Sequence, residues 1–171
     1  MVRIGESMKK KLVLSILVLL ALFIVTGCSK GVKEKDKTVY TCIKKGIEKS
    51  SSYAGSYTLD VTNTAKLDND GKLTYYSTKY NYKMKSKEDC NSSCDAATKW
   101  NNEINEKKYS GSHRETTCKC DKNEYIEEYI YDDIPNLASI VRSDITELKS
   151  DNTFDLETWL NKYEKIGYNC N

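Results

Sequence analysis

Tyr57-Thr58-Leu59-Asp60-Val61-Thr62 is a run in which large apolar or aromatic side chains alternate with polar ones. This period of two is typical of a β-strand with one buried face and one solvated face. Asp68-Asn69-Asp70-Gly71 follows, and Asp, Asn and Gly tolerate the backbone angles of a tight turn. A second strand is expected from Lys72 to Met84. The residues expected on one face of that strand are Tyr76, Thr78, Tyr80 and Tyr82. This stretch therefore predicts an antiparallel hairpin.

The segments that flank the hairpin predict further elements. Thr38–Lys45 is rich in strand-forming residues and is expected to open the sheet, before a polar turn at 46–52. Ser86 and Asp89 resemble a capping box, so a helix is expected after them, up to about Lys108. Apolar residues recur at helical steps along it and are expected to be buried: Cys90, Cys94, Ala97, Trp100 and Ile104.

The last third of the chain predicts two more strands and more helix. The strands are expected from Gly111 through Cys120 and from Glu124 to Asp132, after which Pro135 ends the extended segment. Asn136–Leu148 has a less regular helical spacing of apolar residues, whereas Phe154–Ile166 has a clear apolar stripe with Gly167 placed as its C-cap. The stripe consists of Leu156, Trp159, Leu160, Tyr163 and Ile166.

These elements predict the α+β class for residues 38–171. We expect a single small domain with an antiparallel sheet of about five strands. Two or three helices are expected to pack on one face of this sheet, and disulfides are expected to staple the domain.

The N-terminal segment has the layout of a secretory signal. Three lysines at 9–11 precede an apolar run at 12–25 that contains no charged residue, proline or glycine. Positive charge, a short apolar core and then small residues are typical of a signal peptide. A membrane-spanning helix needs about 20 apolar residues, and this run is shorter. We therefore expect residues 1–27 to be a signal peptide, with Met8 as an alternative start.

Val25-Thr26-Gly27-Cys28 closes the apolar run. It resembles the lipobox of bacterial lipoproteins, in which an aliphatic residue and two small residues precede a cysteine. The resemblance implies that signal peptidase recognises Val25, Thr26 and Gly27, and that Cys28 receives a diacylglycerol thioether and becomes the mature N-terminus. Two acyl chains anchor a protein stably, whereas one binds only marginally.

The expected mature chain has a small, balanced charge. Residues 1–27 hold four basic residues and one acidic residue, which leaves 23 basic and 24 acidic residues and a net charge of −1 after them. A nucleic-acid partner needs a basic patch or stripe, so none is expected. Residues 28–37 contain the lipidated cysteine and small or charged residues, and are expected to form a flexible tether between the membrane and the domain.

Six of the seven cysteines follow Cys28, and an even number outside the cytoplasm predicts disulfides. The alternative is a zinc site from Cys90-x-x-x-Cys94 and Cys118-x-Cys120, but Cys-x-Cys is an unusual spacing for structural zinc. We therefore expect no metal and no other cofactor.

Spacing suggests how these six cysteines pair. Cys90 and Cys94 are about 6 Å apart along a helix, and Cys118 and Cys120 are about 6.6 Å apart on one face of a strand. If helix and strand run antiparallel, the matching distances predict the pairs Cys90–Cys120 and Cys94–Cys118. The two remaining cysteines then form the pair Cys42–Cys170. Six cysteines allow 15 connectivities, so this pairing is a geometric hypothesis.

Several short segments resemble small bacterial lipoproteins of the YehR type. Besides the lipobox, these are Tyr40-Thr41-Cys42, Glu103-x-x-x-Lys107-Lys108-Tyr109-x-Gly111 and Tyr163-x-x-x-Gly167-Tyr168-x-Cys170. The resemblance covers most of residues 38–171 and implies an α+β domain with an antiparallel sheet and helices on one face. The family has no assigned activity, and the four cysteines from 90 to 120 depart from its common pattern.

The sequence supports three hypotheses of function. The first is a membrane-anchored, non-catalytic binding module on the outer face of the cell membrane, with an envelope or cell-wall partner. All 13 tyrosines follow Cys28, and tyrosine joins an apolar ring to a polar tip, which suits ligand grooves. The second hypothesis is a structural or envelope-maintenance lipoprotein with no ligand.

The third hypothesis is an enzyme, for which the sequence offers little. The single histidine, His113, is expected to be a solvated strand residue, and no nucleophile is evident beside it. A thiol–redox protein would need Cys-x-x-Cys, which the chain lacks. We therefore expect that the protein is not an enzyme.

Overall fold

The fold is described here from a computed structural model, in which residues 38–51, 55–107 and 110–171 can be described. The expected signal peptide, the lipobox with Cys28 and the tether lie outside these residues. Thr38–Asn171 is one compact unit.

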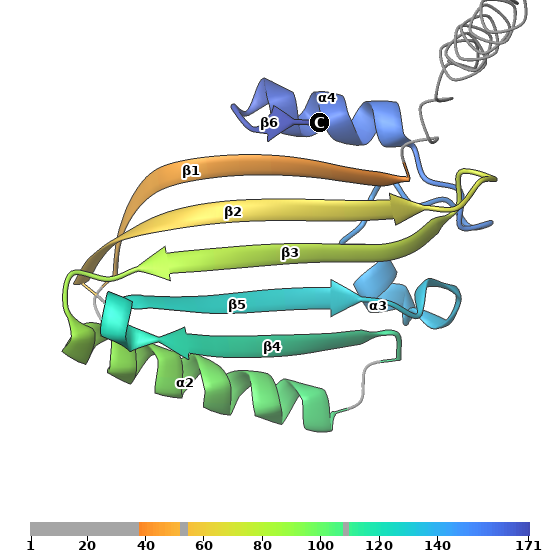
Figure 1. The fold of residues 1–171 in the computed structure, drawn as a ribbon. Helices are drawn as coiled ribbons and strands as arrows, with labels where there is room; N and C mark the ends of the chain where they lie inside the picture. The colour runs from red at the N-terminus through yellow and green to blue at the C-terminus, as the bar shows by residue number, and fades with distance from the viewer. Residues whose placement is uncertain (1–37, 52–54, 108–109) are drawn as a thin grey trace, which may run out of the picture. The chain divides into compact units, whose positions relative to one another are not determined.

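A single antiparallel sheet forms the centre of the domain (Figure 1). Its strand order is β4-β5-β3-β2-β1-β6. The strands are β1 Val39–Ser51, β2 Gly55–Leu67, β3 Leu73–Lys83, β4 Ser112–Lys119, β5 Glu124–Tyr131 and β6 Asn169–Cys170. The described helices are α2 Lys87–Glu106, α3 Ser139–Arg142 and α4 Leu156–Lys165, with 3-10 turns η1 Cys120–Lys122 and η2 Ile134–Asn136.

The predicted α+β class and antiparallel sheet are confirmed, but the expected number of about five strands was too low. The described residues form six strands, because the end of the chain pairs with β1. Reciprocal backbone hydrogen bonds join Thr41 and Asn171 at N–O distances of 2.9 and 3.2 Å. Two residues of strand are too few to predict from alternation, since the period of two needs a longer run.

Strand β1 is longer than predicted because Gly46 forms a bulge rather than a turn. The pairing with β2 shifts register between Lys44 and Ile47. Gly46 has a φ of 69°, which is favourable for glycine alone, and its N–H donates to Asp60 Oδ1 at 2.8 Å. The expected polar turn at 46–52 is therefore wrong, since the strand continues through the bulge to Ser51.

Helix α2 begins at the predicted capping box. Ser86 Oγ accepts the N–H of Asp89 at 3.1 Å and its hydroxyl reaches Asp89 Oδ2 at 2.7 Å. Near the other end, the Asn105 side chain both donates to the carbonyl and accepts the N–H of Arg114, at 2.8 and 2.9 Å. Because β4 is an edge strand, these bonds use backbone groups that would otherwise be open to solvent or to another chain.

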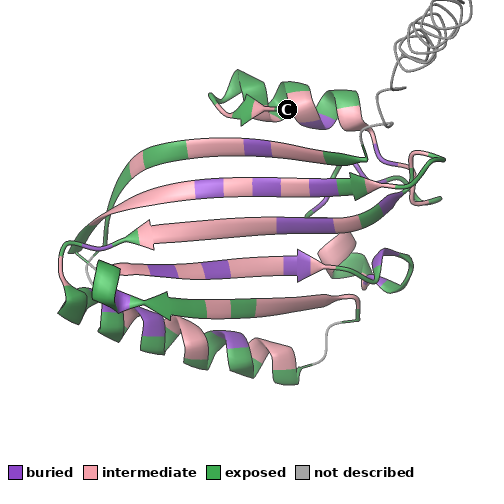
Figure 2. Ribbon diagram, in the orientation of Figure 1, coloured by how far each residue is buried: buried purple, intermediate pink, exposed green. Residues whose placement is uncertain are grey.

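The buried stripe of α2 differs from the prediction by one residue. Trp100 is 54% exposed, whereas its neighbour Asn101 is 1% exposed. Asn101 Nδ2 donates to Thr116 Oγ1 at 2.8 Å and to Glu127 Oε1 at 3.3 Å, so the helix meets the sheet there through a polar contact. Figure 2 shows that this helix has a broad exposed face and only a narrow buried one.

Gly167 caps the C-terminus of α4, as predicted, although the helix itself ends at Lys165. Gly167 has a φ of 87°, its N–H donates to the carbonyl of Glu164 at 2.9 Å, and that of Tyr168 donates to the carbonyl of Tyr163 at 3.0 Å. This is a Schellman motif, and the rings of Tyr163 and Tyr168 supply its usual apolar contact at 4.9 Å between centroids. Ile166, expected in the buried stripe, is 55% exposed because it follows the last helical turn.

The chain between β5 and α4 is mostly irregular. The helical segment expected at 136–148 is reduced to the four residues of α3. Three of its apolar residues, Leu137, Ile145 and Leu148, are nevertheless buried, because turns rather than a helix carry them into the core, whereas Ile140 is 69% exposed.

Helices α2 and α4 cover the same face of the sheet. Tyr76 and Tyr82 lie an even number of residues apart on β3, so both point to one face. Tyr76 contacts Trp159 of α4, with 6.3 Å between centroids, while Tyr82 packs against a core cluster that contains Cys90 and Cys94 of α2. The expected packing of the helices on one face is thus seen for these two.

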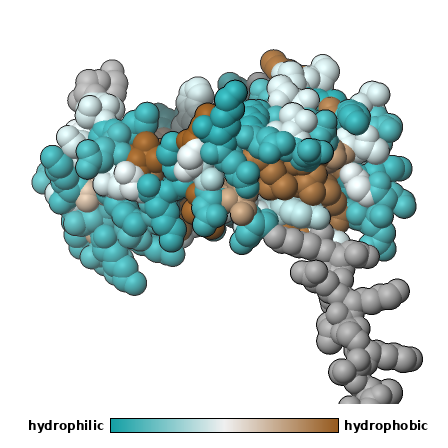
Figure 3. Space-filling model, turned by 90° about the horizontal axis from the view of Figure 1, so that it is seen from above, coloured by the Kyte–Doolittle hydropathy of each residue, from teal (hydrophilic) through white to brown (hydrophobic). Residues whose placement is uncertain are grey.

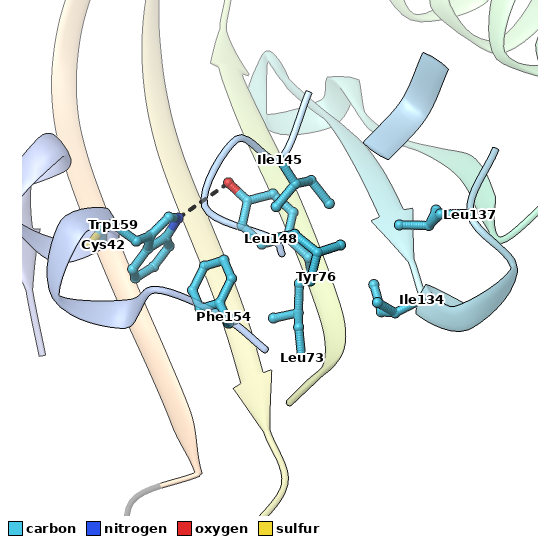
Figure 4. Packing of buried hydrophobic residues seen from close by; sticks show 10 residues of the cluster. Cys42, Leu73, Tyr76, Ile134, Leu137, Ile145, Leu148, Phe154 and Trp159 are labelled. Atoms are coloured by element: carbon cyan, nitrogen blue, oxygen red, sulfur yellow. Dashed lines mark hydrogen bonds between the residues drawn. The ribbon is translucent and has the colours of Figure 1, made fainter. Parts of the chain in front are cut away.

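The larger core cluster lies under α4 (Figure 4). Trp159 is fully buried at its centre, and its Nε1 donates to Tyr76 Oη at 3.5 Å. The remaining apolar members come from β1, β2, β3 and the segment from η2 to Phe154. One long-range contact thus links the C-terminal helix to the middle of the sheet.

Three disulfides join the six cysteines after residue 37, and they are the pairs set out above: Cys42–Cys170, Cys90–Cys120 and Cys94–Cys118. The first ties β1 to β6, and the other two tie α2 to the end of β4 and to η1. Cys42, Cys90 and Cys94 are fully buried, whereas Cys118 is exposed.

Most of the surface in the view from the side of α4 is hydrophilic, and hydrophobic residues gather in a limited patch (Figure 3). Within the part of the chain that the structure describes, no helix is both long enough and apolar enough to cross a membrane.

The carboxylate of Asp60 makes the bulge region sensitive to pH. Lys83 Nζ lies 2.9 Å from Asp60 Oδ2, and this hydrogen bond holds the pKa of Asp60 below its usual value. Its stabilisation is therefore complete above the unfolded-state pKa of about 3.9 and is lost as the pH falls through the lower folded pKa. We expect Asp60→Asn to cost at most about 1 kcal/mol at pH 7, since Lys83 is largely exposed.

Urea denaturation of wild type and Asp60→Asn checks this at pH 7 and at acidic pH. The difference between the two proteins should disappear well below pH 4, about where free Asp titrates. A difference in stability between the two proteins that persists in acid would show that Asp60 stabilises the fold through its shape and not through its charge.

Candidate tyrosine groove

A groove lies on the helix-covered face of the sheet. It has a volume of about 320 Å³, and its floor comes from β2, β3 and β5. Tyr163 of helix α4 and Tyr168, which follows Gly167, form one side of the groove. Asp144 and Ile145 form another side. We name it the tyrosine groove after the six tyrosines that line it: Tyr76, Tyr80, Tyr129, Tyr131, Tyr163 and Tyr168.

The rings of the groove support one another. Tyr80 meets Tyr129 edge to face with 5.4 Å between centroids, and Tyr76 lies 6.0 Å from Tyr131. The hydroxyl oxygens of Tyr76 and Tyr163 are 3.2 Å apart and share a hydrogen bond. These contacts are in the range of favourable aromatic pairs, so the rings are held in place before any ligand binds.

The hydroxyls of Tyr80, Tyr129 and Tyr131 have a different situation. None of the three makes a hydrogen bond to another of the described residues. The rings are half-buried, yet their polar tips remain free to bind something from outside.

Asn63 of β2 carries a second unpaired group in the floor of the groove. It is 2% exposed, and its Oδ1 accepts a hydrogen bond from Thr78 Oγ1 at 2.9 Å. Its Nδ2 is buried and forms no hydrogen bond of normal geometry with a described residue, although the Asn63 side chain lies close enough to the Tyr168 phenol to lower its pKa. A buried donor without an acceptor costs folding free energy, so its retention suggests a purpose.

Five tyrosines of the groove are neutral donors near pH 7, because burial raises the pKa of each: Tyr80, Tyr129, Tyr131, Tyr163 and Tyr168. Burial, followed by the neighbouring Tyr129, raises the pKa of Tyr80 to about 12. Burial also raises the pKa of Tyr129, Tyr131 and Tyr163. For Tyr168 the same effect of burial on the pKa is partly offset by the nearby Asn63 side chain. The groove therefore offers hydrogen bonds rather than a phenolate base.

A second hollow of about 270 Å³ adjoins the groove and shares Tyr129, Tyr131 and Asp144 with it. Its far wall includes Ile104 of α2, so the two hollows together span the sheet face from α4 to α2. The Arg114 guanidinium carbon lies 4.4 Å from the centroid of the Tyr129 ring, as in a cation–π contact.

Arg114 and Asp144 are the charges of this second hollow besides His113, and neither forms an ion pair with a described residue. They carry opposite signs. Burial raises the pKa of Tyr131, Asp144 raises it further and Arg114 lowers it.

A larger hollow, of about 610 Å³, lies near the tip of the β1–β2 hairpin. Its lining is polar and includes Lys49, Lys83 and Lys85. The tyrosine groove is the better candidate, because it contains a buried side-chain donor that lacks a hydrogen-bond partner.

His113, the one histidine, lies on β4 as expected. Its Nε2 is 3.5 Å from Glu115 Oε1 and its Nδ1 is 3.7 Å from Asp132 Oδ2, and all three side chains are exposed by a third or more. No hydroxyl or thiol of a described residue makes a hydrogen bond to His113.

The alternation in the sequence predicted the tyrosine face of β3, but it did not predict the groove. The groove also needs β5 beside β3 and Tyr163 of α4 folded back over the sheet, and these long-range neighbours leave no local pattern. Asn63 was missed because a polar residue between Val61 and Ala65 breaks the apolar alternation only once. That single break was the available signal.

Cys28 and the residues before it, which the sequence analysis assigned to lipidation and cleavage, lie outside the described residues. No protein-family model, curated protein or solved structure matches this chain.

Proposed function

We propose that this protein is a bacterial lipoprotein that holds a non-catalytic binding domain at the outer face of the cell membrane. In this proposal a diacylglycerol on Cys28 anchors the chain, and residues 28–37 tether the domain. The lipobox pattern at 25–28 and the short matches to lipoproteins of the YehR type support it. So do the three disulfides, since such bonds persist in oxidising compartments outside the cytoplasm.

The tyrosine groove is the proposed ligand site. The observation that carries this is a pre-packed aromatic groove whose polar groups lack partners, namely Asn63 Nδ2 and the hydroxyls of Tyr80, Tyr129 and Tyr131. Small-ligand sites are usually concave, with a few convergent polar groups that orient the ligand. Six tyrosine rings line this groove, although most of its accessible lining is polar. The groove volume is at the lower end of the range of about 300–1,000 Å³ for such sites.

Photo-crosslinking in living cells tests this assignment. p-Azidophenylalanine is placed at position 80, in the groove, or at position 75, which lies on the same strand but points to the other face. After irradiation we expect a heavier covalent adduct of the lipoprotein at position 80 and not at position 75. Because both changes replace a tyrosine by a ring of similar size, the two proteins are matched.

The alternative, an envelope-maintenance lipoprotein without a ligand, makes the opposite prediction. It requires that position 80 give no specific adduct. Equal labelling at positions 75 and 80 would likewise contradict the assignment of the groove.

A further inference from the structure

We propose that the tyrosine groove binds a neutral, N-acetylated oligosaccharide. This inference rests on the proposed function, because it names the chemical class of ligand for the same groove. It follows from the groups that the groove leaves without partners and from the charges of Arg114 and Asp144.

The unpaired groups of the groove require a ligand with several hydrogen-bonding oxygens. Asn63 Nδ2 is a buried donor with no acceptor, and its Oδ1 is already used by Thr78. The free hydroxyls of Tyr80, Tyr129 and Tyr131 add three more groups along the floor and the wall. An alkyl chain would bury all of these without partners, which is unfavourable, so a lipid does not fit.

The floor strands do not favour an extended peptide. Peptides bind to sheets chiefly by adding a strand at an open edge. Here β3 pairs along its length with β2 on one side and β5 on the other, so its backbone groups are already bonded within the sheet. The groove therefore offers side chains and not a ladder of backbone groups.

The charges favour a ligand with no net charge. Arg114 and Asp144 carry opposite signs and form no ion pair with described residues. Asp144 lines both hollows, whereas Arg114 lines only the second. A polyanion would be repelled by Asp144, and a polycation would be repelled by Arg114. A neutral ligand with many hydroxyls is repelled by neither residue and can form hydrogen bonds with both Arg114 and Asp144.

A sugar ring combines the two surfaces that the groove requires. The C–H groups on one face of the sugar ring pack on an aromatic ring. The hydroxyls around the sugar ring form hydrogen bonds with the tyrosine hydroxyls. An acetamido group adds a carbonyl oxygen, which is the acceptor that Asn63 Nδ2 lacks. The second hollow, which shares Tyr129 and Tyr131, extends the site for a further ring toward Arg114.

The test uses the full chain in detergent micelles and three probes with the same β-1,4 linkage. They are chitotetraose, which is neutral and N-acetylated, cellotetraose, which lacks the acetamido group, and the deacetylated chitosan tetramer, which is cationic. Isothermal titration calorimetry should show binding of chitotetraose, with each of the other two at least tenfold weaker. Absence of chitotetraose binding at millimolar concentration, or equal affinity for cellotetraose, would overturn the proposal.

Two variants locate the binding. Asn63→Leu should weaken chitotetraose binding at least tenfold. Because it removes the unpaired donor but also the acceptor of the Thr78 hydroxyl, the melting temperature should change little. Tyr80→Phe, which keeps the ring and removes the hydroxyl, should weaken it several-fold, and Tyr75→Phe on the opposite face should leave it unchanged. Wild-type affinity in both Asn63→Leu and Tyr80→Phe would overturn the proposal. If Asn63→Leu unfolds, Tyr80→Phe decides alone.

The outcomes separate this inference from the proposed function. If position 80 gives adducts in cells while chitotetraose does not bind, the groove remains the ligand site and the class of ligand proposed here is wrong. If position 80 gives no adduct, both fail.

Discussion

Replacing Cys42 and Cys170 together by alanine is expected to lower the free energy of unfolding by about 5 kcal/mol. The two residues are 128 positions apart, and a cross-link that closes so long a loop removes a large amount of entropy from the unfolded chain. The change is large against a typical domain stability of about 5–15 kcal/mol. It also removes the covalent link between the two-residue strand β6 and β1, so that noncovalent contacts, such as the backbone hydrogen bonds between Thr41 and Asn171, must hold this end of the chain. Urea denaturation under oxidising conditions measures the loss.

The matched control is the double replacement of Cys94 and Cys118. These cysteines are only 24 positions apart, so the same argument gives about 3.5 kcal/mol. The order of the two losses is the decisive result. A larger loss for the short loop would mean that native contacts around the sulfurs, and not the entropy of the unfolded chain, set the contribution of each bond.

Trp159→Ala is expected to cost about 3–5 kcal/mol, the usual range for removing a buried tryptophan. Trp159 is fully buried and contacts three aromatic rings, with centroid distances of 6.3 Å to Tyr76, 5.9 Å to Phe154 and 5.2 Å to Tyr163. Its removal leaves a cavity between α4 and the sheet. Far-UV circular dichroism in urea measures this loss without relying on tryptophan fluorescence.

Trp100→Ala supplies the comparison, because the chain has two tryptophans and Trp100 lies on the exposed side of α2. We expect its replacement to change the stability by no more than about 0.5 kcal/mol. Similar losses for the two variants would contradict the placement of Trp159 in the core and of Trp100 outside it.

Local patterns in the sequence were sufficient for most of the sheet. The alternation from Tyr57 to Thr62 and the turn at 68–71 predicted the β2–β3 hairpin, and both are present. The Asp68 side chain explains the turn physically, because its Oδ1 accepts the N–H groups of Asp70 and Lys72, both at 2.9 Å. The N-cap of α2 was also predictable, because the cap and the turn both depend on residues that are close in the sequence.

Features that depend on distant partners were not predictable in this way. Gly46 could start a turn or form a bulge, and only the carboxylate of Asp60 on the next strand decides for the bulge. On α2, Trp100 and Asn101 are adjacent, and the polar partners Thr116 and Glu127 select Asn101 for burial. Hydrophobicity alone favoured the wrong residue.

The groove depends both on a local sequence pattern and on contacts between distant parts of the chain. The tyrosines of β3 were expected on one face, and that part required nothing beyond the period of two. The site formed only when β5 was placed beside β3 and α4 returned across the sheet to bring Tyr163 over Tyr76. The unpaired Asn63 Nδ2 became visible only after its surroundings were known.

Our central proposal is that residues 38–171 are an oxidised domain held at the outer face of the cell membrane by a lipid on Cys28. The direct test is the intact mass of the protein purified from cell membranes without reductant, together with alkylation of any free thiols. The account predicts a chain that begins at Cys28, carries a diacylglycerol and has no alkylated cysteine. A chain that keeps residues 1–27, or one with six alkylated thiols, would contradict it.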